Sequence, residues 1–264
     1  MIQQVPRADP FKEQLRESLQ HETLNSRIVK IARHANVYTC GDQDEMVYFI
    51  ESGQIKLLML SPEGKECLLA IHGAGDTFGE LCLAGLGARL ETATTMEETI
   101  LKQIPSSQFV ARLSRDSLLE GFVRYLAVRI ADQQQVIANL VTVDSEQRLG
   151  KTLLQLARTL GNKNHQSTRI ELKLSHDELS EMVGTTRPRI SLFMQRFRNL
   201  GLIETNLDRF LVINEKKLTD YLARIAIAAG HHPGSRHDSF QTRPVIRPML
   251  FPKLAERHIE SRGR

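Results

Sequence analysis

Residues 175–200 read SHDELSEMVGTTRPRISLFMQRFRNL, and their pattern is the clearest indication of the fold. Ser175 and Glu178 have the spacing of a capping box, in which each side chain accepts a hydrogen bond from the other residue's backbone N–H, so a short helix begins there. Gly184 supplies the positive φ that an abrupt turn needs, and Thr186 is placed to cap a second helix. Two helices separated by so short a turn predict a helix-turn-helix.

The second helix has two chemically different faces. Its apolar side chains recur at helical spacing and are expected to face the domain core: Ile190, Phe193, Met194, Phe197 and Leu200. The opposite face and the helix N-terminus carry cations and hydrogen-bonding groups, as in helices that read the DNA major groove. The predicted DNA-binding residues are Ser175, Thr185, Thr186, Arg187, Arg189, Ser191, Leu192, Gln195 and Arg196. The alternative interpretation is a basic face that is merely solvated.

Two short apolar runs follow this helix after Gly201. Residues 202–204 and 210–213 flank a turn at 206–208, which is a pattern typical of a β-hairpin. A helix-turn-helix followed by such a hairpin predicts a winged DNA-binding domain. Because the caps, the glycine turn, the apolar stripe and the hairpin occur together, DNA recognition is favoured over a merely solvated helix.

Charge is distributed unevenly along the chain. Residues 1–145 hold 14 Lys and Arg against 19 Asp and Glu, whereas residues 146–230 hold 14 against 9 and residues 231–264 hold 7 against 3. The positive part therefore coincides with the predicted helix-turn-helix. A basic segment at this place is expected of a domain that contacts DNA phosphates.

The composition is that of an ordinary globular protein, with 264 residues, 41% of them hydrophobic and 25% charged. No apolar run approaches the roughly 20 residues of a membrane helix, and the N-terminus has no signal peptide pattern. Cys40, Cys67 and Cys82 are scattered and odd in number, which suits a reducing compartment. We therefore expect a cytoplasmic protein with no membrane association, no metal site and no catalytic constellation.

Short β runs broken by turns fill the first half of the chain. The predicted strands are residues 37–39, 46–51, 54–60, 66–72, 91–96 and 99–104. Their regular spacing suggests a compact barrel or roll. Between two of them, Gly79-Glu80-Leu81 precedes a glycine-rich loop that ends at Arg89. A glycine turn that opens a short helix presents N–H groups to an anion, and a nearby arginine can hold a phosphate, so a small anionic effector is predicted there.

A helical pattern covers residues 114–143. Its heptad positions are Leu119, Phe122, Leu126, Gln133, Val136 and Leu140, with Arg129 completing the seam. At about 1.5 Å per residue, such a helix is longer than a small roll can cover. We therefore predict that it pairs with the same helix of a second copy. The alternative is a single helix packed on its own roll.

These patterns predict an α+β protein in five segments. They are an N-terminal extension (1–21), a β-roll sensor (22–113), a dimerisation helix (114–143), a winged helix-turn-helix domain (144–230) and a disordered basic tail (231–264).

This order of elements resembles the Crp/Fnr family of bacterial transcription regulators over about residues 22–213. The motifs that carry the resemblance are Ser52-Gly53-Gln54-Ile55-Lys56, Gly75-Asp76 with Gly79-Glu80-Leu81, Asn139-Leu140 with Asp144 and Arg148-Leu149, and Glu178-Leu179 with Val183-Gly184 and Arg187. The resemblance implies a β-roll like that of cyclic-nucleotide-binding domains, a dimer helix and a winged DNA-binding domain. It also implies RNA polymerase as a partner.

The resemblance further implies an effector site. In cAMP-binding members the Gly-Glu pair binds ribose and phosphate, an Arg-Ser pair clamps the cyclic phosphate, and Thr-Ser on the dimer helix reaches the adenine. The corresponding residues here are Gly79, Glu80, Leu81, Arg89, Leu90, Gln133 and Gln134. Leu90 replaces the serine and Gln133-Gln134 replace Thr-Ser, so we expect a cyclic nucleotide or another small anion, but not cAMP bound as in the archetype. The alternative is that Arg89 pairs with Glu80 or Glu91 in an empty roll.

The sequence thus predicts a homodimeric regulator that binds specific double-stranded DNA and is switched by an effector at the roll. One alternative is a cyclic-nucleotide-regulated signalling module that acts on a protein partner. Another is a regulator that senses redox through its cysteines.

Overall fold

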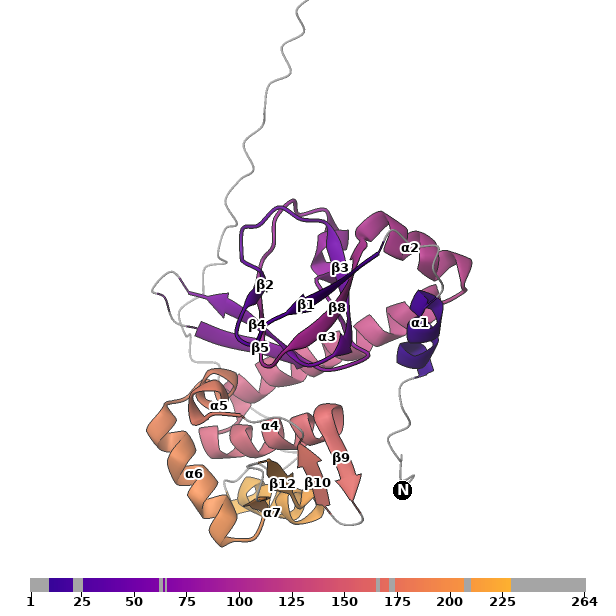
Figure 1. Ribbon diagram of the computed structural model, residues 1–264. Coiled ribbons are helices and arrows are strands. Elements are labelled where there is room, and N and C mark those ends of the chain that lie inside the picture. The colour runs from indigo at the N-terminus through magenta and orange to yellow at the C-terminus, as the bar shows by residue number, and fades with distance from the viewer. Residues whose placement is uncertain are drawn as a thin grey trace, which may run out of the picture.

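The computed structural model describes residues 10–20, 26–61, 64, 66–164, 167–170, 174–206 and 210–228. It confirms the predicted fold class: a β-roll, a long helix and a C-terminal helix-turn-helix domain follow one another along the chain (Figure 1). The tail predicted over residues 231–264 and the turn at Leu207 and Asp208 lie outside the described residues. None of the described helices is both long enough and apolar enough to cross a membrane.

Two antiparallel four-stranded sheets form the roll, with strand orders β1-β8-β3-β6 and β2-β7-β4-β5. The strands are β1 (Arg27–Ile31), β2 (Asn36–Tyr38), β3 (Met46–Ser52), β4 (Ile55–Leu60), β5 (Glu66–His72), β6 (Thr77–Phe78), β7 (Thr92–Thr95) and β8 (Thr99–Pro105). Six of them were predicted to within two residues, whereas β1 and β6 were not. One buried cluster fills the space inside the roll: Tyr38, Tyr48, Ile50, Ile55, Leu57, Phe78, Ala93 and Leu101.

Helix α1 (Pro10–Gln20) belongs to the core of the sensor domain rather than extending from it. Its Phe11, Leu15 and Leu19 are at most 5% exposed and pack with α2 (Ser106–Arg115) and α3 (Leu119–Thr142). In Figure 1, α1 lies beside these two helices. The contact is close, because a Cβ added to Gly121 of α3 would come within 2.9 Å of the Phe11 ring.

Helix α3 presents one face to its own roll and another to solvent. Phe122 and Tyr125 are buried, and Arg129 is engaged by the roll, so the predicted seam through Phe122 and Arg129 is wrong. A different set of exposed apolar residues has heptad spacing: Leu119, Val123, Ile130, Ile137 and Leu140, with Val128, Val136 and Val141 exposed beside them. Helix α3 also begins at residue 119 and not at 114, because the chain turns between α2 and α3 with Ser117 at a φ of 57°.

The C-terminal domain surrounds a third four-stranded sheet, of order β11-β12-β10-β9. Its elements are α4 (Ser145–Leu160), β9 (Gly161–Asn164), β10 (Ser167–Ile170), α5 (His176–Val183), α6 (Arg187–Asn199), β11 (Ile203–Thr205), β12 (Leu211–Ile213) and α7 (Glu215–Ala228). The predicted wing corresponds to β11 and β12, which pair antiparallel, while β9 and β10 were not predicted.

The roll and the C-terminal domain share one apolar cluster. Leu58, Leu68 and Ile71 of the roll pack with the buried residues of the C-terminal domain, among them Leu156 of α4 and Leu179 of α5. Burial of such side chains stabilises their contact by roughly 1.5–3 kcal/mol each. The two domains are therefore in direct contact in this structure.

Candidate functional site

Both helices of the helix-turn-helix begin where the sequence predicted. Ser175 Oγ accepts from the Glu178 N–H at 3.1 Å, and Glu178 Oε2 accepts from the Ser175 N–H at 3.0 Å, which confirms the capping box. Gly184 ends α5 with a φ of 65°. Thr186 is the N-cap residue of α6, but its side chain makes no capping hydrogen bond.

Helix α6 buries the predicted stripe and exposes the predicted reading face. Ile190, Phe193, Met194 and Phe197 are buried, but Leu200 is 50% exposed, because the helix ends at Asn199 and the stripe ends with it. The exposed residues of the predicted DNA-binding set are Ser175, Thr186, Arg187, Arg189, Leu192, Gln195 and Arg196, while Thr185 and Ser191 are half-buried. Cations and hydrogen-bonding groups at this place suit contacts with DNA.

Hydrogen bonds and ion pairs hold parts of this face. Ser191 Oγ lies 2.8 Å from His176 Nδ1, so the first helix positions a side chain of the second. Arg187 Nε lies 3.6 Å from Asp177 Oδ1, with both groups exposed. Arg196 Nη1 lies 2.6 Å from Glu146 Oε2 of α4, and Tyr221 donates to the same carboxylate at 2.6 Å. Burial and then the nearby cations lower the pKa of His176.

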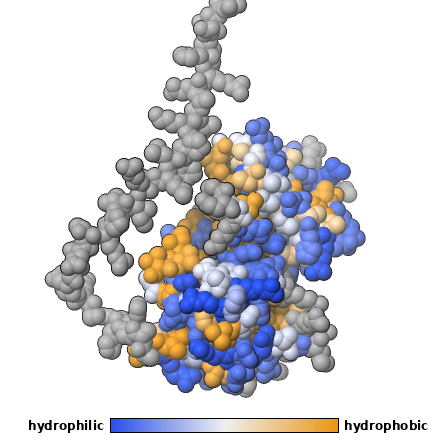
Figure 2. Space-filling model, turned by 90° about the vertical axis from the view of Figure 1, so that its left-hand side faces the viewer, coloured by the Kyte–Doolittle hydropathy of each residue, from blue (hydrophilic) through white to orange (hydrophobic). Residues whose placement is uncertain are grey.

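The apolar surface of this side of the molecule is patchy. Figure 2 shows the side on which β4, β5 and α6 lie in Figure 1, and there hydrophobic patches interrupt a mostly hydrophilic surface. Met59, Leu60 and Leu192 are 43%, 55% and 54% exposed. An exposed leucine on a helix that reads DNA can contact a thymine methyl group.

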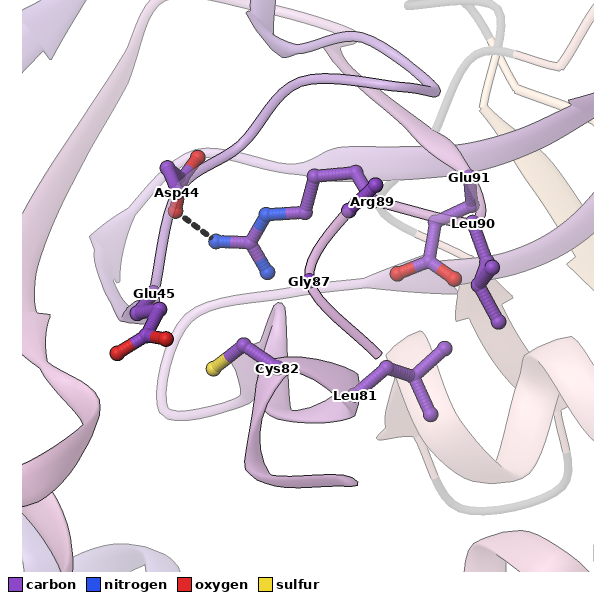
Figure 3. A pocket seen from close by; sticks show the side chains of 9 residues that line it. Asp44, Glu45, Leu81, Cys82, Gly87, Arg89, Leu90 and Glu91 are labelled. Atoms are coloured by element: carbon purple, nitrogen blue, oxygen red, sulfur yellow. Dashed lines mark hydrogen bonds and ion pairs between the residues drawn. The ribbon is translucent and has the colours of Figure 1, made fainter. Parts of the chain in front are cut away.

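In the roll, Arg89 is buried, and both terminal nitrogens of its guanidinium bond to the protein itself (Figure 3), whereas its Nε has no hydrogen-bond partner among the described residues. Its Nη1 donates to the Gly79 carbonyl at 2.6 Å, and Nη2 donates to the Met46 carbonyl at 2.5 Å and to Asp44 Oδ1. The guanidinium also lies over the Tyr38 ring, 4.1 Å from its centroid. Arg89 therefore pairs with an acid, as the alternative interpretation held, but the partner is Asp44 and not Glu80 or Glu91.

We call the part of the roll around Gly79, Leu81, Arg89 and Leu90 the corner. Two further acids near it, Glu80 and Glu91, have other partners. Glu80 Oε1 lies 2.9 Å from Arg129 Nη1 of α3, and Glu91 accepts from the Tyr38 hydroxyl at 3.0 Å. Burial raises the pKa of Glu91. Burial, followed by the charge of Glu91, also raises the pKa of the Tyr38 hydroxyl. Of the predicted effector residues, Arg89 is thus held within the roll, whereas Glu80 is paired with α3.

The corner leaves little free space. The rings of Tyr38, Tyr48 and Phe78 pack against one another with centroids 4.9–6.0 Å apart. The cavity beside Arg89 measures about 10 Å³, which is about the space of one water molecule. Leu81 and Leu90 line it but are 43% and 41% exposed.

Gln133 and Gln134 are exposed on α3 and do not line the cavity beside Arg89. Gln133 instead lines a larger cavity, of about 220 Å³, between the roll, α3 and α4. The structure therefore brings Gly79, Leu81, Arg89 and Leu90 together but not the two glutamines with them.

A buried polar network was missed from the sequence. His72 is 6% exposed, with Nε2 3.2 Å from Arg129 Nη2 and Nδ1 3.9 Å from Asp76 Oδ2. Asp76 also pairs with Lys12 of α1 at 2.6 Å. Burial and then the Arg129 charge lower the pKa of His72 to about 4. The spacing of His72 and Asp76 across a glycine turn is visible in the sequence, but their partners come from helices far away in the chain.

The cysteines are free thiols in different surroundings. Cys40 and Cys67 are exposed, whereas Cys82 is half-buried and its Sγ lies 3.8 Å from the Met46 carbonyl. Burial raises the pKa of the Cys82 thiol, which lowers its reactivity. Among the residues that the structure describes, no group of three or more His, Cys, Asp or Glu could hold a metal ion.

Comparisons with known proteins agree with this division into two parts. The family model of the cyclic nucleotide-binding domain matches residues 28–116, and that of the Crp-like helix-turn-helix domain matches residues 147–221. A CRP-like cAMP-activated global transcriptional regulator from Mycobacterium tuberculosis is 29% identical over 191 residues, which cover 72% of this chain and 85% of that protein. A global nitrogen regulator from Synechococcus elongatus is 28% identical, covering 74% of this chain and 90% of that protein.

Solved structures are similar over the same range. A CooA mutant from Carboxydothermus hydrogenoformans has a TM-score of 0.64 at 26% identity, covering 78% of this chain and 94% of that one. FixK2 from Bradyrhizobium japonicum has a TM-score of 0.65 at 18% identity, covering 75% of this chain and 97% of that one, and so has the same fold.

Proposed function

The chain belongs to the Crp/Fnr family of transcription regulators, and on that basis we propose that it acts as a homodimer on a two-fold symmetric site in double-stranded DNA. The observation that carries this proposal is the face of α6. Arg187, Arg189, Leu192 and Gln195 are exposed together, while the opposite stripe is buried.

Each reading residue has a chemical counterpart in the major groove. Arg187 can donate two hydrogen bonds to guanine, and Leu192 can contact a thymine methyl. Arg196 is directed toward Glu146 and is better suited to a phosphate than to a base. We therefore propose DNA contacts for the whole predicted set, with base reading concentrated at the N-terminal half of α6.

The exposed stripe of α3 supports the dimer. Val123, Ile130 and Ile137 are 55–62% exposed and seven residues apart, and the exposed Leu119 and Leu140 extend the stripe at its two ends. Such a stripe is the pattern of a two-stranded coiled coil. Pairing of α3 with its copy would place two recognition helices on one DNA duplex. We propose that the DNA-bound dimer acts on RNA polymerase, in the cytoplasm.

We further propose that the roll does not bind cAMP through Arg89 as the family's archetype does. Asp44 already neutralises Arg89, Leu90 stands where a serine would hold the phosphate, and the aromatic rings fill the interior. A small anion would have to displace Asp44. A change at the roll would then shift the population between two dispositions of the recognition helices.

The DNA proposal is tested by selecting duplexes from a random pool and measuring their affinity at two salt concentrations. We expect a two-fold symmetric consensus and an affinity that falls steeply with salt, because phosphate contacts release counterions. A module that acts only on a protein partner would select no sequence. Such a result would contradict the proposal.

The effector proposal is tested by calorimetry with cAMP and cGMP. We expect no saturable heat for cAMP at micromolar concentration. A micromolar or tighter signal that disappears in Arg89→Ala would show that the corner opens for the nucleotide, and the proposal would fail.

A further inference from the structure

A second, larger cavity lies between the roll and the C-terminal domain. It measures about 220 Å³ and is lined by β5, α3 and α4, with Met182 of α5 and Lys12 of α1 at its edges. The domains also touch at two places outside the cavity lining. The Leu160 side chain comes within 3.1 Å of the position that a Cβ on Gly73 would take, and Lys56 pairs with Glu178.

Most of the exposed lining is apolar. Leu68 and Ile71 of β5, Val136 of α3, Leu156 of α4 and Met182 contribute to it. Leu68, Ile71 and Leu156 are themselves buried, so this wall is continuous with the apolar cluster that joins the domains. An apolar wall of this kind favours an apolar ligand, because water in the cavity finds few hydrogen-bonding partners there.

Both cations at the polar end of the cavity are paired with carboxylates. Lys12 pairs with Asp76 at 2.6 Å, and Arg129 pairs with Glu80 at 2.9 Å. His72 sits between Arg129 and Asp76 and is uncharged near neutral pH. Asp132 is a further carboxylate side chain of the lining. An anion would find no free cation here, whereas a hydroxyl or N–H group could hydrogen-bond at this end.

The volume sets the size of the occupant. An engineered apolar cavity of about 150 Å³ binds benzene in another protein. A cavity of about 220 Å³ therefore holds one aromatic ring or small bicycle with a single polar group.

We propose that this cavity binds one small, uncharged, mainly apolar molecule of that size. The molecule would contact β5 on the roll side and α4 on the other, and would hold the C-terminal domain against the roll. Its binding site is separate from the corner around Arg89. The consequence for DNA binding rests on the proposed function, but the binding itself does not.

Indole is a suitable probe, since it is uncharged and fluorescent and the chain contains no tryptophan. We expect the full chain to enhance and blue-shift indole fluorescence in a saturable manner, with a Kd below about 1 mM. Val136→Phe should weaken this binding at least tenfold, because the ring would occupy the cavity. Val110→Phe is the matched control: Val136 and Val110 are 38% and 39% exposed, but Val110 lies on α2 away from the cavity.

Thr152→Phe of α4 fills the same cavity from the opposite wall and replaces Val136→Phe if that variant fails to fold. Absence of saturable indole binding would overturn the proposal, and so would undiminished binding in both filled variants. Benzoate, as an anionic probe, should bind at least tenfold more weakly than indole; equal binding would overturn the assignment to uncharged ligands.

The link to DNA binding is measured separately, by DNA affinity with and without indole. We expect indole to change the affinity of the unaltered chain at least threefold and to leave that of Val136→Phe unchanged. Indole binding with no effect on DNA affinity would overturn the link. A chain that bound indole but no DNA at all would instead contradict the proposed function.

Discussion

Lys56 of β4 and Glu178 of α5 lie 122 residues apart in the chain and form an ion pair, with 3.4 Å between Nζ and Oε1. Both side chains are only 16% exposed. The same carboxylate completes the capping box with Ser175. One side chain therefore starts the first helix of the helix-turn-helix and attaches it to the roll.

Loss of this ion pair should loosen the contact between the domains. Lys56→Ala leaves Glu178 without its cation in a mostly buried place, and we expect it to lower the free energy of unfolding by roughly 1–2 kcal/mol. Urea denaturation measures this. Lys30→Ala is the control, because the Lys30–Glu98 pair is more than 60% exposed and should contribute little. Equal losses in the two variants would argue against a special role for Lys56.

The dimer should depend on the exposed stripe of α3. Ile130→Glu places a charge in the predicted seam without disturbing the core, since Ile130 is 55% exposed. We expect monomers in sedimentation velocity and loss of specific DNA binding. Gln135→Glu, an exposed position on the other side of α3, should remain dimeric. A dimeric Ile130→Glu would place the interface elsewhere.

Arg89 should contribute to stability as well as to the shape of the roll. Arg89→Met leaves Asp44 and the carbonyls of Gly79 and Met46 without their donor, so we expect a loss of roughly 3 kcal/mol. Arg124→Met is the control, because the Arg124–Glu120 pair is fully on the surface. Thermal and urea denaturation would both report the difference, and a loss below that of the control would contradict the buried pairing.

Stability should fall as the pH falls from about 6.5 to about 4, because His72 stays neutral in the fold. The pKa of His72 is about 4 in the folded chain and about 6.5 when unfolded, so the unfolded state binds the extra proton in this window. The contribution is up to about 3 kcal/mol. The groups that face His72 are Arg129, Asp76 and, further away, Lys12; the pKa of Asp76 is lowered and that of Arg129 is raised, so neither of these two titrates in this window.

Urea denaturation between pH 7.5 and 4.5 tests this, with His72→Gln as the comparison. The variant should lose most of the dependence on pH. An unchanged slope in the variant would assign the pH dependence to other groups.

Two arginines of α6 should differ in what they do on DNA. Arg187→Ala should weaken the free energy of DNA binding by roughly 1–3 kcal/mol and reduce the specificity for guanine at one position in each half-site. Arg196→Ala should weaken binding to all sequences alike. It should also lower the slope of log affinity against log salt concentration by about one unit. Selection from random duplexes and salt titration measure the two effects. If both variants kept the parent's sequence preference, Arg187 would not be a base reader.

The sequence was most informative where structure depends on neighbouring residues. The capping box of Ser175 and Glu178, the turn at Gly184 and the stripe from Ile190 to Phe197 are all set within one or two turns of helix, and the structure has them as predicted. The prediction that Leu200 is buried was wrong, because periodicity does not show where a helix ends.

Features that depend on distant contacts could not be predicted. A heptad pattern on α3 fits two registers, and only the contact of Phe122 and Arg129 with the roll decides between them. Arg89 and Asp44 are 45 residues apart, so nothing local identified Asp44 as the partner. Strands β9 and β10 are short and polar; β10 forms on the hydrogen-bonding edge of β12, and β9 then pairs with β10.

The packing of α1 has a practical consequence for anyone who wishes to study the sensor by itself. A fragment that began at residue 22, where the sequence alone would place the first domain boundary, would lack Phe11, Leu15 and Leu19. It would leave Phe109, Phe122 and Tyr125 open to water and Asp76 without its lysine. Such a fragment would aggregate or pair artificially through the uncovered rings, so isolation of this sensor must start upstream of Pro10.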